Sequence, residues 1–451
     1  MRMPSVRSTC SSACPAMRDI LLFAIVFGLL PFMLKRPVIG IFAFTWISLM
    51  NPHRLTYGAA YEFPFAALIA VVTLVGVLLS KEPKRFPLTP VTLVLLAFIA
   101  WMTFTSFFAL EPQLVWKEWD RVMKTLFIAL LAMAVIHTEK DIKIFAAVTG
   151  LSLGFYGLKG GAFTLGSGGS SHVLGPEGSY ITDNNALALA LITAAPIIWF
   201  LQLHAHRKWL RIGLGTVAVL TIVAAAGSYS RGALLAGAAM LTFLWLKSRH
   251  KLRVGIVLIL LVPLIFSAMP DKWFDRMGTI DNYTEDASAL GRINAWYFAA
   301  NVAKDNILGG GYNVFTHKMF FIYAPVPLDH HAAHSIYFQV LGEHGYIGLA
   351  LFLLLMACAW RSGTRIVRYC RNRDDLKWAS DLAAMCQVSI IGYAVGGAFL
   401  SLAYYDLYYE LIALLVLLEK VIMRKPDSAR SRIAASPMML APAQGEGGKS
   451  P

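Results

Sequence analysis

Charged side chains are scarce in this chain. Asp, Glu, Lys and Arg make up 15% of its 451 residues, whereas 57% of the residues are hydrophobic. A soluble protein needs more charge to cover its surface, so the composition excludes an ordinary soluble enzyme. The chain instead contains repeated apolar runs of about 20 residues. These runs predict an all-α polytopic membrane protein, because a helix satisfies its own backbone hydrogen bonds within a bilayer.

Cysteines are also few, and none of the five lies in the long polar loops. This placement excludes a disulfide framework, and the absence of a Cys/His spacing excludes a zinc site of that kind. No small-residue cleavage site follows the first apolar run, so we expect no cleaved signal peptide.

Nucleotide-binding fingerprints are missing as well. Gly309-Gly310-Gly311 precedes no P-loop lysine, and the Gly/Ser run 160–171 follows no strand pattern. The net charge of +14 does not indicate nucleic acid, because Lys and Arg cluster in short segments between apolar runs. Some of these side chains are expected to contact anionic lipid headgroups.

The apolar runs predict about twelve transmembrane helices. Residues 18–50 fit either two short helices split at Lys35-Arg36-Pro37 or a single pass with a re-entrant part. We expect one net crossing there, with a total of thirteen spans as the alternative. The other predicted spans are 62–79, 88–108, 121–137, 142–158, 184–203, 210–228, 231–247, 252–269, 336–360, 379–402 and 406–423.

Basic residues set the orientation. Lys/Arg-rich segments near 81–85, 204–208, 247–253 and 361–373 all fall on one side of the predicted membrane, which the positive-inside rule makes the cytoplasm. In a bacterium the opposite side would be the periplasm, where ATP and sugar nucleotides are absent. The chain then divides into five regions. A polar N-terminal segment at 1–17 precedes transmembrane helices at 18–269, which include a short periplasmic loop near 159–183. A large periplasmic loop at 270–335, further transmembrane helices at 336–423 and a disordered cytoplasmic tail at 424–451 follow.

The large loop is expected to contain an amphipathic helix. Ile293, Trp296, Tyr297 and Ala300 follow the i, i+3, i+4, i+7 pattern, which indicates a helix with one apolar face on or near the outer membrane interface. The four tyrosines between residues 404 and 409 are expected to form an interfacial aromatic belt.

His334 ends the large loop, directly before an apolar span. It could be a histidine that simply hydrogen-bonds at a helix start, or a base that accepts a proton from a hydroxyl nucleophile near neutral pH. His330 and His334 have the i, i+4 spacing of a helical metal pair, but the segment lacks the Glu of a zincin motif and follows Pro325 and Pro327. We therefore predict no metal.

Several basic residues lie at predicted outer ends of spans, against the positive-inside trend. Arg231 is either a snorkelling anchor or an anion clamp, since charge-assisted hydrogen bonds contribute about 1.5–3 kcal/mol each. Arg292 is either a solvated charge or part of an anion site at a helix N-terminus. Lys159 is a weaker candidate of the same kind. Glu343 could orient a histidine, mark a polar cavity or be a packed interior carboxylate.

These candidates comprise outward-facing arginines and a base-like histidine, without a metal ligand set. The chemistry that fits them is transfer from an activated lipid phosphate to a hydroxyl group. Pyrophosphate already carries its activation as a leaving group, so the reaction would need neither ATP nor a cofactor.

Five short motifs occur in a fixed order on the predicted outer side. They are Asp183-Asn184-Asn185-Ala-Leu-Ala, Ser230-Arg231-Gly232-Ala-Leu-Leu, Gly291-Arg292 with Trp296, Leu308-Gly309-Gly-Gly-Tyr312, and His334-Ser335-Ile-Tyr337-Phe-Gln339-Val-Leu-Gly-Glu343.

With these motifs the chain resembles the O-antigen ligase and O-antigen polymerase family of bacterial membrane glycosyltransferases, most strongly over roughly 180–425. The resemblance implies that His334 is the catalytic base and that Arg231 and Arg292 grip the undecaprenyl pyrophosphate of a glycan donor. In the ligase branch the acceptor is the lipid A–core oligosaccharide, and transfer is metal-independent and inverting at the inner membrane. Residues expected to support this site are Lys159, Tyr337, Glu343, His330 and His331.

Three other functions stay open. A polymerase that joins two lipid-linked glycans and a protein O-oligosaccharyltransferase differ from the ligase only in the acceptor. A lipid-linked glycan transporter would place polar residues along the middle of the membrane. The predicted spans are mostly apolar and their polar residues gather at the outer side, which favours an enzyme.

Overall fold

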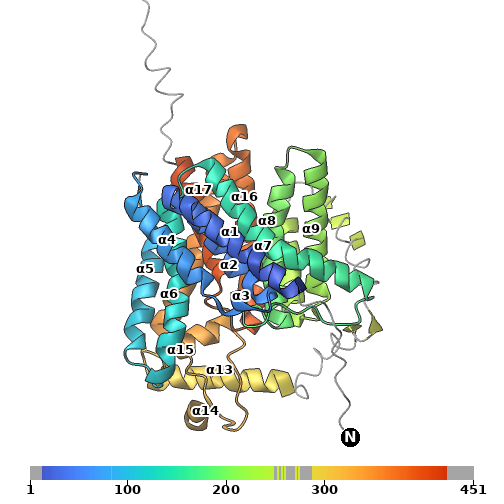
Figure 1. Ribbon diagram of the computed structural model, residues 1–451. Coiled ribbons are helices and arrows are strands. Elements are labelled where there is room, and N and C mark those ends of the chain that lie inside the picture. The colour runs from blue at the N-terminus through green and yellow to red at the C-terminus, as the bar shows by residue number, and fades with distance from the viewer. Residues whose placement is uncertain are drawn as a thin grey trace, which may run out of the picture.

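The computed structural model describes residues 13–82, 84–247, 251–252, 255–256, 259–260, 270–271, 273–274 and 287–423. Within these residues every regular element is a helix, which confirms the all-α prediction (Figure 1). The predicted span 252–269 lies largely outside the described residues, and the tail 424–451 and residues 1–12 lie wholly outside them.

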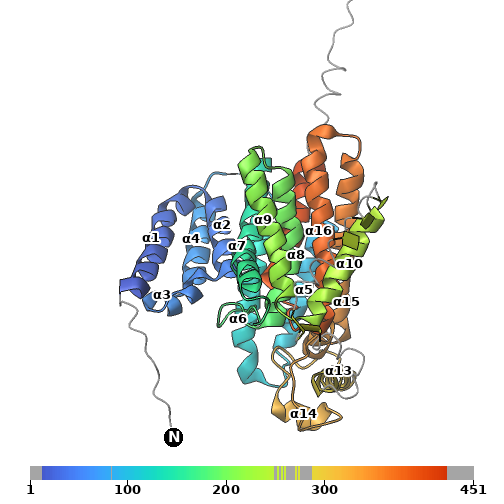
Figure 2. The same cartoon turned by 90° about the vertical axis from the view of Figure 1, so that its right-hand side faces the viewer.

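The N-terminal helices form a lobe at one side of the bundle (Figure 2). Arg18 Nη1 at the start of this lobe donates to Leu55 O at 3.3 Å, so the chain has returned to its starting level by residue 55. The expectation of one net crossing over 18–50 is therefore wrong, and the two-helix alternative holds. Arg36 is extended because the residue before a proline disfavours the helical conformation, and the helix breaks there. The lobe consists of α1 (Ala13–Lys35), α2 (Pro37–Met50), η1 (Pro52–Leu55), α3 (Ala59–Glu62) and α4 (Phe65–Leu79).

The remaining long helices form the main bundle. Asp183 caps one of them as predicted, since its Oδ1 accepts from Asn185 N at 2.9 Å and Ala186 N at 3.1 Å. The bundle comprises α5 (Pro90–Ser106), α6 (Pro112–Val135), α7 (Glu139–Gly166), α8 (Asn184–Leu203), α9 (Lys208–Ala226), α10 (Arg231–Lys247), α15 (Ile336–Cys370), α16 (Lys377–Gly396) and α17 (Asp406–Met423), with short turns η2 (Asp374–Leu376) and η3 (Gly397–Phe399).

Several of the described helices suit a membrane. Six are long and apolar enough to cross one, at Met17–Lys35, Glu139–Gly166, Asn184–Leu203, Lys208–Ala226, Ile336–Cys370 and Asp374–Phe399. Shorter apolar helices lie at Pro37–Met50, Phe65–Leu79 and Pro90–Ser106. The total of about twelve spans assumed one net crossing over 18–50; the number of spans stays a prediction, with thirteen as the alternative.

The core of the bundle surrounds α17, which packs against α2, α5, α6, α7, α15 and α16. Apart from Glu419, Val421 and Met423 near its end, every residue of α17 is buried. Tyr404 and Tyr408 are 2% and 0% exposed, so the expected aromatic belt is wrong. These tyrosines pack inside the protein because the last helix lies at the centre of the bundle and not at its lipid-facing rim.

Two helices, α13 (Ala287–Asp305) and α14 (His317–Tyr323), lie across one end of the bundle (Figures 1 and 2), which we call the α13 end. The helix predicted in the large loop is present, but the face that it buries within the protein differs from the predicted apolar face, whose position at a membrane interface stays a prediction. Tyr297 is 59% exposed, whereas Ala295, Phe298 and Val302 are fully buried. The difference arises because α13 packs against α14 and α15: Phe298, for example, stacks on Phe320 at a ring distance of 4.3 Å.

Candidate functional site

A polar pocket at the α13 end brings together parts of the chain that are distant in sequence. It is formed by the start of α8, the turn before α10, the first turns of α13 and the segment after η3. Arg231 and Arg292 both line it, as their predicted shared role requires. The complete lining is Asn185, Tyr229, Ser230, Arg231, Gly232, Arg292, Phe399 and Leu400.

Arg231 is the first residue of α10, and the turn before it is held firmly. Tyr229 adopts a left-handed conformation with φ 56°, which is uncommon for a residue other than glycine. Its hydroxyl donates to Gly169 O, and Asn184 Nδ2 donates to Ser228 O at 2.7 Å. The guanidinium therefore starts from a fixed backbone at a helix N-terminus, where the helix dipole also favours an anion.

Arg292 lies on α13, one turn before a residue that fixes the next part of the site. Trp296 Nε1 donates to Ala333 O at 2.9 Å, and its ring stacks on Phe338 at 5.1 Å with an interplanar angle of 7°. Helix α13 thus carries an arginine of the pocket and, through Trp296, also contacts residues before and after His334 in the chain.

His334 has a left-handed backbone with φ 42°, and its N–H donates to Ser401 Oγ at 2.8 Å. The pKa of His334 is lowered from its usual 6.5, mainly by burial and then by the positive charges of Arg292 and His331, while Asp183 opposes the shift. A lowered pKa keeps the ring neutral near pH 7, as a general base requires. Its backbone bond to Ser401, the residue after the lining residue Leu400, places His334 beside the pocket.

The neighbouring histidines have structural contacts of their own. The ring of His330 lies 2.9 Å from Phe315 O through Nε2 and packs at 4.0 Å from the ring of His317. His331 Nε2 lies 2.8 Å from Asp329 Oδ1. Residues 330–334 are not helical, so the i, i+4 spacing of His330 and His334 does not create a shared helical face. Across the described ranges, no group of three His, Cys, Asp or Glu side chains is placed to hold a metal.

Three other predicted residues lie outside the lining of this pocket. Tyr337 Oη donates to Ala394 O at 2.8 Å and joins α15 to α16. Lys159 is exposed and lies within α7, which continues to Gly166, so the first part of the predicted loop 159–183 is helical. Glu343 is 3% exposed and accepts hydrogen bonds from Tyr404 Oη at 2.6 Å and Asn313 N at 3.2 Å. These contacts make Glu343 a packed interior carboxylate.

Sequence reasoning missed Ser401, Phe399 and Leu400. The two hydrophobic residues line the pocket, and Ser401 holds the backbone of His334. Phe399 ends η3 and the other two follow it, and no motif distinguishes them from other loop residues. Asn185 was part of a quoted motif, but only the fold brings it beside the two arginines.

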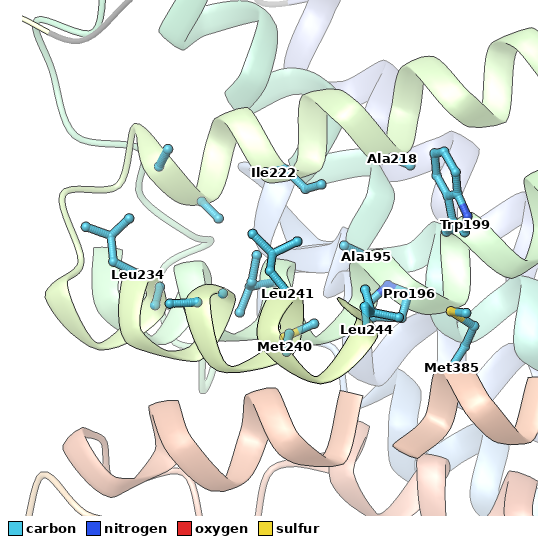
Figure 3. A pocket seen from close by; sticks show the side chains of 16 residues that line it. Ala195, Pro196, Trp199, Ala218, Ile222, Leu234, Met240, Leu241, Leu244 and Met385 are labelled. Carbon is cyan, nitrogen blue, oxygen red and sulfur yellow. The ribbon is translucent and has the colours of Figure 1, made fainter. Parts of the chain in front are cut away.

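An apolar groove adjoins the turn that carries Arg231. Figure 3 shows side chains of α8, α9 and α10 pointing into it, from Leu234 at one end to Trp199 at the other. Ala226 and Ala233, which line the groove, flank the Tyr229–Arg231 turn. All of its lining side chains are apolar: Ile192, Ala195, Pro196, Trp199, Ala218, Ile222, Ala225, Ala226, Ala233, Leu234, Gly237, Ala238, Met240, Leu241, Leu244 and Met385.

Two regions of the chain match known family models. Residues 216–353 match a model described as O-Antigen ligase, and this region includes Arg231, Arg292 and His334. Residues 17–206 match a family of unknown function, DUF5935, and include the N-terminal lobe and the start of α8. No curated protein matches the chain.

Proposed function

We propose that this chain, which belongs to the O-antigen ligase and polymerase family through residues 216–353, is an O-antigen ligase. The glycan would move from undecaprenyl pyrophosphate to a sugar hydroxyl of lipid A–core, at the periplasmic face of a bacterial inner membrane. The observation that carries this proposal is that Arg231 and Arg292 line one pocket while His334, with a lowered pKa, lies close to it.

The two arginines are suited to the donor's pyrophosphate. Each guanidinium presents a planar fork of donors that fits phosphate oxygens. Negative charge grows on the pyrophosphate as its bond to the sugar breaks, so fixed positive groups bind the transition state more strongly than the ground state. Arg231 adds the N-terminus of α10, which favours the same charge.

His334 is suited to activate the acceptor. The acceptor oxygen attacks the anomeric carbon, its proton moves to a ring nitrogen of His334, and the electron pair of the breaking bond leaves with the pyrophosphate. A single displacement of this kind inverts the anomeric centre. Because the pKa of His334 is lowered, the ring is neutral and free to accept the proton at neutral pH.

The apolar groove is suited to the lipid tail of the donor. Its lining contains no charged side chain, and it ends beside the turn that presents Arg231. A polyprenyl chain in this groove would bury apolar surface and bring its pyrophosphate to the pocket.

The test is glycan transfer by the purified protein from undecaprenyl pyrophosphate glycan to lipid A–core in the presence of EDTA. We expect the wild type to be active and His334→Ala to be inactive. His206→Ala, an exposed histidine beyond α8, is the matched control and should retain wild-type activity. Donor binding without transfer to lipid A–core would instead favour the polymerase or protein-glycosylation activity, and loss of activity in EDTA would contradict the metal-independent mechanism.

A transporter is less well supported by this arrangement. A transporter is expected to have ionisable residues within the bundle, and Asp406 and Glu410, which are 5% and 7% exposed, are such residues. They border a cavity about the size of one water molecule, which is too small to pass a lipid-linked glycan.

A further inference from the structure

The buried helix α17 carries two carboxylates one turn apart. Asp406 and Glu410 lie on the same side of the helix because residues four apart are neighbours on a helical surface. Both line a small cavity enclosed by α2, α6, α7 and α17. Neither residue takes part in the transfer chemistry proposed above, so their burial has a different explanation.

Each carboxylate is surrounded by hydroxyl groups. Asp406 Oδ1 accepts hydrogen bonds from Ser48 Oγ at 2.6 Å and Thr125 Oγ1 at 2.9 Å. Glu410 Oε2 accepts one from Thr149 Oγ1 at 2.9 Å. The polar atoms at this place are therefore oxygens contributed by α2, α6, α7 and α17.

A fourth hydroxyl points to a ligand. Thr45 is 1% exposed and lines the same cavity as Asp406 and Glu410. Its hydroxyl interacts with the Glu410 carboxylate but makes no hydrogen bond of normal geometry with any residue in the described part of the chain. A buried hydroxyl without such a bond costs free energy, so its retention beside a cavity favours an occupant.

Charge balance favours a cation. Arg121 acts on Asp406 and offsets part of its charge. The charge that acts on Glu410 is that of Asp406, which has the same sign. An ionised carboxylate inside a membrane protein is costly, so the pair needs either a bound cation or a proton.

We propose that this cavity binds one Na⁺ ion through Asp406, Glu410 and Thr45. Oxygen ligands suit a hard cation, and one unit of charge neutralises what Arg121 leaves uncompensated. A divalent ion is disfavoured, since it would bring one charge more than Arg121 leaves uncompensated. The site would stabilise α17, which directly follows the segment whose Ser401 holds His334.

The experiment is thermal unfolding of the purified full-length protein at pH 8, with NaCl replacing choline chloride at constant ionic strength. We expect the Tm of the wild type to rise saturably, by roughly 3 °C at ten times the dissociation constant. Glu410→Gln should lose this Na⁺-dependent rise, because the charge that requires the cation is gone. Without Na⁺, it should be at least as stable as the wild type.

A second variant separates the ligand from the charge. Thr45→Val keeps both carboxylates and should raise the half-saturating Na⁺ concentration about tenfold, as expected for the loss of one ligand. Thr193→Val is the matched control, since the Thr193 hydroxyl is equally buried, also lacks a hydrogen-bond partner among the described residues and lies outside this cavity. It should leave the Na⁺ response unchanged.

Two results would overturn the proposal. One is a wild-type Tm that is the same in NaCl and choline chloride at pH 8, as expected if a proton neutralises the pair. The other is a Glu410→Gln variant that keeps the full Na⁺ response. If Glu410→Gln does not fold, direct Na⁺ titration calorimetry of the wild type and Thr45→Val decides the question by the same criteria.

Discussion

The molecule has two polar clusters with opposite charge that lie in different parts of the fold. Arg231 and Arg292 line a pocket at the α13 end that is built from turns and loop segments. Asp406 and Glu410 lie on a buried helix and are enclosed on all sides by neighbouring helices. Both cavities are small, but the first is bounded by turns and loop segments at one end of the bundle, whereas the second is bounded by four helices of its interior. Place in the fold, more than cavity size, separates the proposed reaction site from the proposed ion site.

The largest effect is expected from loss of His334, the proposed catalytic base beside the arginine pocket. His334→Ala should lower kcat by about 10²–10⁴-fold, the usual contribution of general acid–base catalysis. Donor binding should change little, because the arginines remain. Transfer assays and donor-binding measurements on the same preparation check this, and near-normal kcat would remove His334 from the role of base.

The arginines should have the next largest effect. Arg231→Ala and Arg292→Ala should each lower kcat/KM by about 10–150-fold, which corresponds to the loss of one charge-assisted hydrogen bond to the pyrophosphate. Steady-state kinetics at limiting and saturating donor check this. Arg211→Ala, an exposed arginine on α9, is the control and should behave like the wild type; wild-type kinetics in both pocket variants would contradict the pyrophosphate clamp.

A smaller effect is expected from the residue that holds the base in place. Ser401→Ala removes the acceptor of the His334 N–H, a bond that contributes about 0.5–1.5 kcal/mol. We expect kcat to fall by up to about tenfold with KM nearly unchanged. Ser389→Ala, at another buried serine, is the control. An equal loss in both variants would indicate general destabilisation and not positioning of His334.

The smallest effect is a shift along the pH axis. Because the pKa of His334 is lowered, kcat/KM should stay constant down to below pH 6.5 and fall only as His334 becomes protonated. Arg292→Gln removes one of the charges that lower this pKa, so the residual activity of that variant should begin to fall at a higher pH. If the activity of the wild type and of Arg292→Gln begins to fall at the same acidic pH, the effect of Arg292 on the pKa of His334 is contradicted.

The sequence was sufficient to propose Arg231, Arg292 and His334 as site residues but not to predict their arrangement. Arg231, Arg292 and His334 stood out because charged or titratable residues at predicted outer ends of spans are unusual. Ser401 carried no such signal, since a loop serine becomes significant only when folding places it 2.8 Å from His334 N. Glu343 could not be assigned from sequence, because its partners Tyr404 and Asn313 lie on other segments.

The sequence by itself determined the helical class, the cap at Asp183 and most long apolar helices, because periodicity, capping and hydrophobicity act within one segment. Only the tertiary structure decided which face of α13 is buried, that α17 is central, and that Asp406 and Glu410 share a cavity. The sequence of one helix does not specify which helices pack against it, and the same apolar residue can face lipid or protein. Burial of charge in the core is therefore decided only when the helices pack together.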